Sequence, residues 1–377
     1  MFYPPELLSW TTCVSRHLPL LSKTQAQVLA WYSFAVTVVQ SSGISQVSYF
    51  LACLLGQSEN TVRQRLRESL YAARDKRGLQ RRDVAVEACF APLLRWVLSL
   101  WQSDDRILFL AVDATTLRQT FTVLSISVLV SGCALPVAWA VVPATAAGSW
   151  KPHWQRLLRA LSVPTDLRVV VLADRGLYAK WLFDAIIACH WHPLLRINPQ
   201  GSVTICENGQ RLALSQLAHR CQGKWWRGEA LCFSGATRLR CTLLVLYDNQ
   251  QQAVWMLVTD LAPAEVSPTW YALRWWIETG FKALKTAGFH WERTRMVDPA
   301  RAERLWLVMA LSCLRLATLS PTPEDAPVFP PLPARLSLFR RAFLSQLAAL
   351  LLQRPLFTHP LPPQSFPPPP SLEILQC

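Results

Sequence analysis

Two aspartates stand directly after apolar runs of strand length. Asp113 follows Ile107–Val112, and Asp174 follows Val169–Ala173. Acidic side chains at strand ends in an α/β sheet lie where ligands usually bind. Each aspartate alone also fits the role of a turn residue or a helix cap after a strand. A carboxylate site for a metal ion would therefore need a further acid from elsewhere in the chain.

A third acid, Glu278, lies in a segment that predicts a strong helix near Thr269–Thr286. Ser267-Pro268 stands before the start of this segment and Gly288 just past its end, as is typical of helix boundaries. An α-helix turns by about 100° per residue. That rotation gathers the apolar residues of the segment on one side of the helix: Leu273, Trp276, Ile277, Phe281, Ala283, Leu284 and Ala287.

The opposite side of this helix carries polar side chains. Tyr271, Arg274, Glu278 and Lys285 share one stripe roughly 60° wide at this rotation per residue. A solvated helix surface would also show such a stripe, with Arg274 and Glu278 as an i,i+4 ion pair. The geometry of the helix alone leaves both interpretations open.

The identities and spacing of these four residues carry a resemblance. Tyr271-x2-Arg274-x3-Glu278-x6-Lys285 resembles the YREK signature of a large family of bacterial insertion-sequence transposases of the DDE type. The letters around Glu278 resemble the glutamate helix of that family well beyond the four signature positions. A shared signature on a shared helix therefore favours the functional interpretation of the stripe.

The two aspartates also fit this family. Asp174–Tyr178 (Asp-Arg-Gly-Leu-Tyr) is similar to its second-aspartate motif, and Val112–Thr115 (Val-Asp-Ala-Thr) to its first. The resemblance runs in order from about Leu108 to Leu316. It implies an α/β fold with an RNase H-like catalytic core, interrupted by a β-strand insertion in the long gap between Asp174 and Glu278.

The resemblance implies a metal-dependent reaction on DNA. Asp113, Asp174 and Glu278 would be the catalytic residues and would hold two Mg²⁺ ions about 4 Å apart, with Mn²⁺ able to substitute. Water would attack first and free a 3′-hydroxyl at the end of the element, and this hydroxyl would then attack target DNA. The implied partners are double-stranded DNA, as terminal inverted repeats and as target, and a second copy of the chain in a synaptic homodimer.

The polar stripe would supply the DNA contacts next to the acids. Arg274 and Lys285 would hold phosphates beside the scissile bond, and Tyr271 would add a hydroxyl contact to phosphate.

Relatives excise their element in a cut-and-paste reaction through a DNA hairpin, which an aromatic side chain of the β insertion assists by stacking on a flipped base. Trp225 and Trp226, in an expected basic loop at Lys224–Arg227, are the candidates for this role. Trp255 is the alternative, although a tryptophan within a strand more often belongs to the core.

The first 100 residues predict a helical, DNA-binding region. Helices are expected at Gln25–Gln40, at about Ser45–Leu55 and from Glu59 onward, with a short turn at Gly56–Ser58. This order gives a helix-turn-helix pattern near residues 45–73. The third helix places Val62, Leu66 and Leu70 on a narrow core face. The expected DNA contacts are Arg63, Arg65 and Arg67, and the competing interpretation is a solvated helix of a helical bundle.

Periodicity predicts the rest of the domain organisation. Residues 101–200 form the first part of the catalytic core, 201–261 the β-rich insertion, 262–320 the second part with the glutamate helix, and 321–377 a proline-rich tail. The expected strands are Ile107–Val112, Phe121–Val130, Leu135–Val142, Val169–Ala173, Pro193–Ile197, Thr242–Leu246 and Ala253–Val258. Further helices are expected at Trp154–Leu161, Tyr178–Ile187 and Arg335–Leu352.

Composition narrows the class of partner. The chain carries 38 Lys and Arg against 24 Asp and Glu, a net charge of +14, which favours an anionic partner such as nucleic acid or a membrane surface. Its 11 cysteines contain no C-x-x-C pair, so zinc-knuckle and disulfide-framework classes are excluded. The N-terminus shows no signal-peptide pattern, and a location in the bacterial cytoplasm, at the nucleoid, is expected.

Three alternatives to an active transposase remain. A catalytically inactive descendant would bind DNA only, although all three acids are present. A membrane protein could use the uncharged segment Gln119–Trp150, although serines and prolines break it into two strand-like runs with a turn at Ser131-Gly132. A phosphohydrolase could use Asp113 as a nucleophile, but its motif has a second acid where Thr115 stands.

Overall fold

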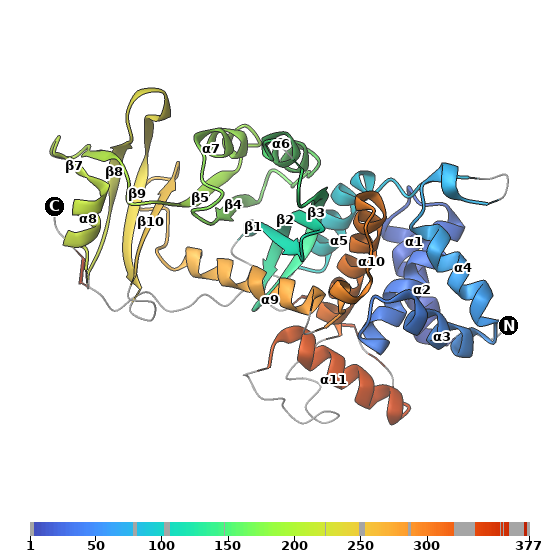
Figure 1. Ribbon diagram of the computed structural model, residues 1–377. Coiled ribbons are helices and arrows are strands. Elements are labelled where there is room, and N and C mark those ends of the chain that lie inside the picture. The colour runs from blue at the N-terminus through green and yellow to red at the C-terminus, as the bar shows by residue number, and fades with distance from the viewer. Residues whose placement is uncertain are drawn as a thin grey trace.

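The computed structural model describes residues 4–77, 81–101, 106–146, 148–222, 224–248, 253–285, 288–319, 336–354, 356, 358–361 and 373–374. An 11-stranded sheet runs through the molecule in the order β3-β2-β1-β4-β5-β10-β9-β8-β6-β7, with β11 beside β8 (Figure 1). Its strands are β1 (Ile107–Leu117), β2 (Phe121–Val130), β3 (Cys133–Pro143), β4 (Arg168–Ala173), β5 (His192–Ile197), β6 (Ser202–Ile205), β7 (Arg211–Ala213), β8 (Lys224–Cys232), β9 (Leu239–Asp248), β10 (Ala253–Thr259) and β11 (Glu373–Ile374). A mixed α/β fold is therefore present, as the sequence predicted.

The uncharged segment forms a β-hairpin. Strands β2 and β3 pair antiparallel around a turn at Ser131 and Gly132, whose φ angles are 32° and 83°. Every residue of β2 is buried. These strands overturn the alternative of a transmembrane helix at Gln119–Trp150. Within the described residues, no single helix has the length and apolar content to cross a bilayer; α2 (Lys23–Val39) and α3 (Ile44–Leu55) reach them only as a pair bent by 103°.

The first strand extends beyond the apolar run from which it was predicted. Strand β1 continues past Val112 to Leu117 because its antiparallel pairing with β2 persists, and Asp113 lies opposite Ser125. On its other side β1 pairs parallel with β4 only as far as Val112 opposite Ala173. Asp113 therefore lies inside a strand rather than after one.

The segment between β5 and the glutamate helix extends the central sheet. Strand β10 pairs antiparallel with β5, and β9, β8, β6 and β7 follow outward. The short helix α8 (Leu214–Arg220) lies beside these outer strands at the left end of Figure 1. Strands β6 to β10 thus lengthen one continuous sheet.

Helices cover both faces of the central strands. In Figure 1, α6 (Lys151–Arg159) and α7 (Lys180–Ile187) lie above β1–β5, and α9 (Trp275–Leu284) lies below them. Helices α5 (Phe90–Ser99) and α10 (Pro299–Thr318) pack on β3, where Phe90, Trp139 and Trp306 meet. Burial of these large aromatic side chains is the main favourable term that joins the helices to the sheet.

The N-terminal helices form a bundle against α10. They are α1 (Pro5–His17), α2, α3 and α4 (Glu59–Ser69). Gly56 ends α3 in the left-handed region at φ 60°, and the Ser58 hydroxyl caps α4 by accepting the Thr61 N–H. Helix, short glycine turn and helix therefore follow one another here as the sequence predicted.

One helix of the proline-rich tail is described. Helix α11 (Leu338–Leu351) packs against α2 and α10. Its bounds are close to the predicted range, Arg335–Leu352. Most of the tail, including the four prolines at 367–370, lies outside the described residues.

Candidate active site

Asp113 and Asp174 emerge side by side from adjacent parallel strands. Because Val112 and Ala173 form the last pair of the β1–β4 ladder, the next residue of each strand is an aspartate. The Oδ1 atom of Asp113 accepts the Ala114 N–H at 2.8 Å, and Oδ1 of Asp174 accepts the Arg175 N–H at 2.7 Å. One oxygen of each carboxylate is thus fixed to the backbone while the other is available.

The available oxygens and Glu278 converge on one guanidinium. Arg274 places Nη1 3.1 Å from Asp113 Oδ2, and Nη2 3.4 Å from Asp174 Oδ2 and 3.8 Å from Glu278 Oε1. The Arg274 side chain is only 14% exposed. Three residues spread over 166 positions of the sequence therefore form one acid cluster, which we define as Asp113, Asp174 and Glu278 around Arg274.

The acid cluster is partly shielded from solvent. Burial raises the pKa of Asp113, and the nearby carboxylates of Asp174 and Glu278 raise it further. The Arg274 guanidinium and the Ala114 N–H act in the opposite direction on this pKa. A desolvated carboxylate with acidic neighbours favours a bound cation, and Arg274 supplies one.

Helix α9, which carries Glu278 to the acid cluster, packs closely against β3. A Cβ atom at Gly280 would stand 3.0 Å from the Ala134 carbonyl oxygen and 3.2 Å from Ala134 Cβ. The absence of a side chain at Gly280 therefore allows the helix to approach the sheet. Ile277, Phe281 and Leu284 on the predicted apolar face are buried.

Tyr271 lies before the start of the α-helix that the sequence predicted to carry it. Residues Trp270–Arg274 form a 3-10 turn, and the α-helix begins only at Trp275, so the rotation assumed for one continuous helix does not hold at its start. Tyr271 is 3% exposed, and its hydroxyl donates to the Ala173 carbonyl at 3.3 Å. Burial raises its pKa to about 12. Tyr271 therefore contacts the strand that ends in Asp174, and its expected contact to phosphate stays a prediction.

Lys285 lies at the C-terminal end of α9 and contacts β1. Its Nζ atom donates to Thr115 Oγ1 at 2.5 Å and to the Thr116 carbonyl at 2.6 Å. Burial lowers the pKa of this ammonium. Lys285 thus joins α9 to the strand of Asp113, two residues beyond that acid.

The expected basic loop at Lys224–Arg227 is a strand. In β8 the Trp226 side chain is buried and lies across Gly228, where a Cβ atom would stand 2.6 Å from the indole. The prediction of Trp226 as a base-stacking residue is therefore wrong, because strand alternation turns it into the core. Trp225 is half-buried and carries the Arg227 guanidinium at 5.5 Å from its ring centroid.

Trp255 is connected to the acid cluster through its neighbours Tyr271 and Arg196. It packs edge-on against Tyr271 with ring centroids 5.3 Å apart, and Arg196 lies 5.6 Å from its ring centroid. Arg196 Nη1 stands 4.0 Å from Asp174 Oδ1. The sequence reasoning overlooked Arg196; the signal was a single arginine inside the apolar run of β5.

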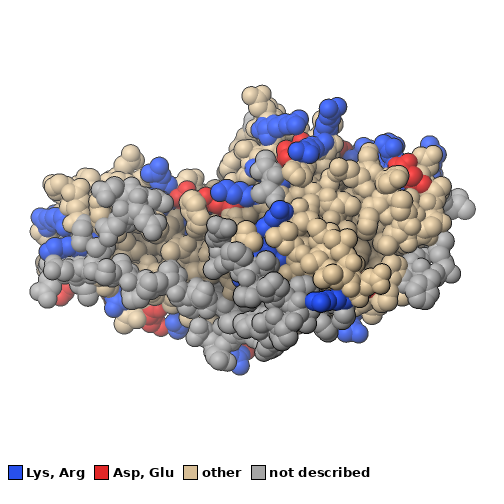
Figure 2. Space-filling view, turned by 90° about the horizontal axis from the view of Figure 1, so that it is seen from below, with Lys and Arg blue, Asp and Glu red and all other residues tan. Residues whose placement is uncertain are grey.

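The three arginines predicted on α4 are exposed and already have neighbours. Arg63 pairs with Glu59 at 3.7 Å, Arg65 donates to Gln57 Oε1 at 2.8 Å, and Arg67 donates to the Tyr71 hydroxyl at 3.2 Å. None of these contacts joins α4 to the acid cluster. Figure 2 shows further Lys and Arg side chains at both ends and along one edge of the face it presents.

The donor chemistry of the acid cluster fits a hard divalent cation. All three side chains offer carboxylate oxygens, which Mg²⁺ prefers. Among the described residues, no group of three or more His, Cys, Asp or Glu side chains is close enough to hold a metal ion directly. The physical reason at this site is that the Arg274 guanidinium stands between the acids, so a metal would require Arg274 to move away.

Comparison with known proteins identifies a family whose model spans the positions of these acids. Residues 105–314, more than half of the chain, match a family model described as "Transposase DDE domain". Among solved structures, the chain is similar to a cryo-EM structure of the piggyBac transposase synaptic complex with hairpin DNA, with 9% sequence identity and a TM-score of 0.37, over 93% of this chain and 80% of that chain. No curated protein matches the sequence.

Proposed function

The chain belongs to the transposase DDE domain family, and from this membership we propose that it cleaves and joins DNA as the transposase of a bacterial insertion sequence. The observation that carries the proposal is the convergence of Asp113, Asp174 and Glu278 on Arg274. A DNA cleavage or nucleotidyl-transfer reaction follows from the family. The choice of these acids, the YREK signature and the cut-and-paste route are our assignments.

An RNase H-like catalytic core is part of the proposal. Strands β1, β2 and β3 form an antiparallel meander, and β4 and β5 then add in parallel beside β1. This order supports a core made of residues 101–200 and 262–320, with residues 201–261 as its insertion. Residues 1–100 would be the DNA-binding region and 321–377 the tail.

Two Mg²⁺ ions, or Mn²⁺ in their place, would be held by the acid cluster. When bound, such ions lower the pKa of water and stabilise the leaving oxygen in phosphodiester cleavage. The backbone N–H groups of Ala114 and Arg175 hold Oδ1 of each aspartate, so that the Oδ2 atoms point to the shared centre. The tight packing of Gly280 on β3 keeps Glu278 at the same centre.

Arg274 and Arg196 would act on the DNA phosphates. When DNA and metal enter, the guanidinium of Arg274 would leave the carboxylates and hold a phosphate beside the scissile bond. Arg196 stands within 4.0 Å of Asp174 and would contact the same strand. Lys285 keeps its contacts to Thr115 and Thr116 and would reinforce β1 rather than bind phosphate as its main role.

A hairpin intermediate would need an aromatic side chain that can reach a flipped base. Trp255 is half-buried and joined to Asp174 through Arg196, which makes it the better candidate. Trp225, half-buried in β8, is the second. The element's terminal inverted repeats and the target would be the DNA partners, bound by a homodimer at the nucleoid.

The proposal is tested on a plasmid that carries the gene with its native flanking DNA. Asp113→Ala, Asp174→Ala and Glu278→Ala should each abolish excision and strand cleavage while DNA binding stays near that of the wild type. Asp166→Ala, which removes an exposed acid outside the cluster, is the matched control and should remain active. Excision at the wild-type rate by any of the three cluster variants would refute the assignment of that acid. Inactivity of the wild type with intact DNA binding would favour a catalytically inactive descendant.

A further inference from the structure

A basic cleft opens among the N-terminal helices, away from the acid cluster. It encloses about 740 Å³ between the start of α2, the second half of α4 and the residues that follow α4. Its basic lining residues are Arg65, Lys76, Arg77, Arg81 and Arg82, and its other polar lining residues are Ser22, Thr24, Gln25, Glu68 and Ser69. We call this feature the basic cleft.

The basic cleft carries a large excess of positive charge. Five cationic side chains line it against one carboxylate, that of Glu68, which accepts a hydrogen bond from Gln64 Nε2 at 2.7 Å. Arg77 and Arg82 are exposed, and no ion pair joins their side chains to any residue that the structure describes. The first turn of α2 forms part of the wall, and that end of a helix adds partial positive charge.

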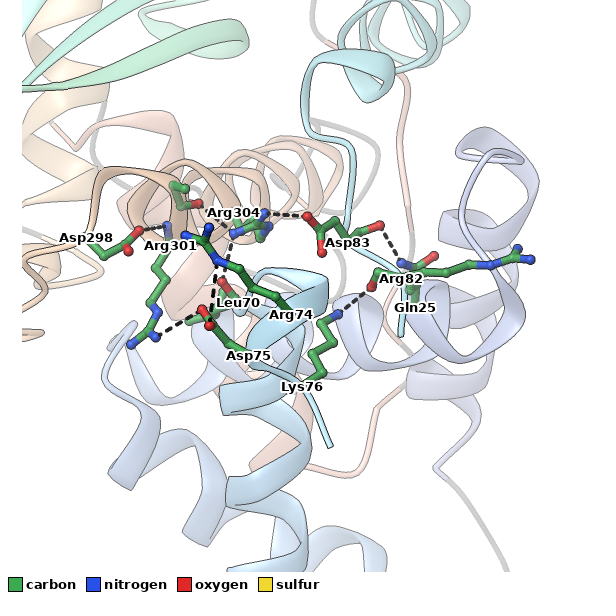
Figure 3. Close-up of polar contacts among 11 residues, drawn as sticks. Gln25, Leu70, Arg74, Asp75, Lys76, Arg82, Asp83, Asp298, Arg301 and Arg304 are labelled. Atoms are coloured by element: carbon green, nitrogen blue, oxygen red, sulfur yellow. Dashed lines mark hydrogen bonds and ion pairs between the residues drawn. The ribbon is translucent and has the colours of Figure 1, made fainter. Parts of the chain in front are cut away.

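Hydrogen bonds hold the two sides of the basic cleft together, as Figure 3 shows. Lys76 Nζ donates to the Arg82 carbonyl at 2.7 Å, and Gln25 Nε2 donates to the Asp83 carbonyl at 2.9 Å. These bonds tie the residues on either side of positions 78–80 to each other and to α2. These hydrogen bonds therefore fix the backbone that carries the arginine side chains of the cleft.

Helix α10 holds the same residues from the side of the catalytic core. Arg304 donates to the Leu70 carbonyl at 3.1 Å and to Asp83 Oδ2 at 3.4 Å. Arg301 pairs with Asp75 at 3.7 Å (Figure 3). It also lies 4.2 Å from the centroid of the Tyr71 ring. In Figure 1, α10 lies between β1–β3 and the N-terminal helices. One helix thus connects the basic cleft with the sheet that carries the acids.

We propose that the basic cleft binds the phosphodiester backbone of duplex DNA at a distance from the cleaved bond. This inference rests on the proposed function, because it assumes a DNA substrate. Arginine guanidinium groups are well suited to phosphate. Phosphate oxygens are repeated along every duplex, so these side chains can bind DNA of arbitrary sequence.

The test compares two double variants that remove the same charge. Arg77→Gln with Arg82→Gln changes the basic cleft, whereas Arg16→Gln with Arg95→Gln changes exposed positions of the same helical region outside it. Affinity for a fluorescent duplex of arbitrary sequence is measured by anisotropy between about 50 and 200 mM salt, a range over which phosphate contacts dominate the salt dependence. Thermal unfolding of both variants should match the wild type.

The salt dependence of binding decides the outcome. Loss of two phosphate contacts makes the negative slope of log K against log salt shallower by about 1.8, so wild-type affinity should fall about tenfold more than that of the cleft variant over this fourfold rise in salt. The control variant should keep the wild-type slope. A cleft variant with the wild-type slope, or with a change seen on single-stranded RNA but not on duplex DNA, overturns the inference.

This outcome is separate from that of the proposed function. If the wild type binds duplex DNA with a strong salt dependence and the cleft variant does the same, only the cleft is wrong. If the wild type does not bind duplex DNA at all, both the inference and the proposed function fail.

Discussion

Arg274 Nη1 lies 3.1 Å from Asp113 Oδ2, and the same guanidinium also faces Asp174 and Glu278. Three carboxylates that would repel one another are thereby held together by an internal cation. Such an arrangement keeps the acids close before any ligand arrives, and the cation must be exchanged before a metal ion can bind. Arg274 therefore stabilises the acid cluster without metal and competes with a metal ion for the same carboxylates.

The first prediction concerns Arg274→Ala. Removal of the guanidinium should lower the free energy of unfolding without metal by about 2 kcal/mol, because three partly buried carboxylates lose their counter-charge. The same variant should gain more stability than the wild type when Mg²⁺ is added, since the competing cation is gone. Thermal unfolding with and without Mg²⁺ measures both effects.

Arg274→Lys is the matched control for this prediction. It keeps the charge but loses the fork that reaches several carboxylates, so its stability should fall between those of the wild type and the alanine variant. An equal response of all three proteins to Mg²⁺ would contradict the competition between Arg274 and metal. DNA cleavage should be weak in both variants, together with binding of the element ends.

A second prediction concerns the contact of α9 with β3. Gly280→Val should lower the free energy of unfolding by about 1–3 kcal/mol, because the new side chain collides with the backbone of Ala134. It should also reduce cleavage, since Glu278 lies half a turn away on the displaced helix. Lys282→Ala, at an exposed position of the same helix, should leave stability unchanged in the same denaturant titration. A stable Gly280→Val protein with full activity would show that α9 does not depend on this contact.

Much of the central sheet could be predicted because its signals are local. The strands around Ser131-Gly132 are uncharged, β-branched and separated by a short turn, and the observed bounds of β2 equal the predicted ones. The placement of Asp113 was less accurate. The polar residues that follow Val112 masked the continuation of β1, which depends on pairing with β2, a long-range interaction.

In the candidate site too, contacts within one helical turn could be predicted, whereas contacts between distant segments could not. The spacing of Arg274 and Glu278 predicts their common face because both lie within about one helical turn. Tyr271 lies in a 3-10 turn instead, and its burial depends on Trp255 and Ala173 from distant strands. Arg196 was missed for a related reason: only the sheet order places β5 beside β4 and Asp174.

A third prediction concerns pH and Glu303. Burial raises the pKa of this carboxyl, and its Oε1 accepts the Val141 N–H at 3.1 Å. Between the unfolded value of about 4.5 and the raised folded pKa, the folded state holds a proton that the unfolded state has lost, so the free energy of unfolding falls as pH rises through this window. Glu303→Gln keeps the acceptor and should remove this fall.

The difference between Glu303→Gln and wild type should therefore be small at about pH 4 and should favour the variant at neutral pH. Denaturant unfolding at several pH values gives the difference directly. Glu207→Gln, at an exposed position, makes the same charge change and should show no such pH-dependent gain. A constant difference between the Glu303 variant and wild type over this range would contradict the prediction.

The last prediction concerns the buried cation that holds α11. Arg315 is 4% exposed on α10, and burial lowers its pKa to about 9. Its guanidinium donates to Gln346 Oε1 on α11 and, at 2.6 Å, to Thr37 Oγ1 on α2, and it lies 4.4 Å from the centroid of the Phe34 ring. Gln346 in turn donates from Nε2 to the Thr37 carbonyl at 2.9 Å. No carboxylate takes part in these contacts, although Glu6 acts on the charge electrostatically, so neutral acceptors supply the hydrogen bonds of the guanidinium.

Gln346→Leu should therefore lower the free energy of unfolding by about 2–3 kcal/mol, because a buried cation and the Thr37 carbonyl each lose a partner. Combining it with Arg315→Met should recover part of this loss, since the double variant no longer buries an unsatisfied charge. Leu347→Ala, at a partly exposed position of α11, is the control and should cost much less. Additive losses in the double variant would mean that Arg315 and Gln346 do not depend on each other, and that α11 is held by its apolar face instead.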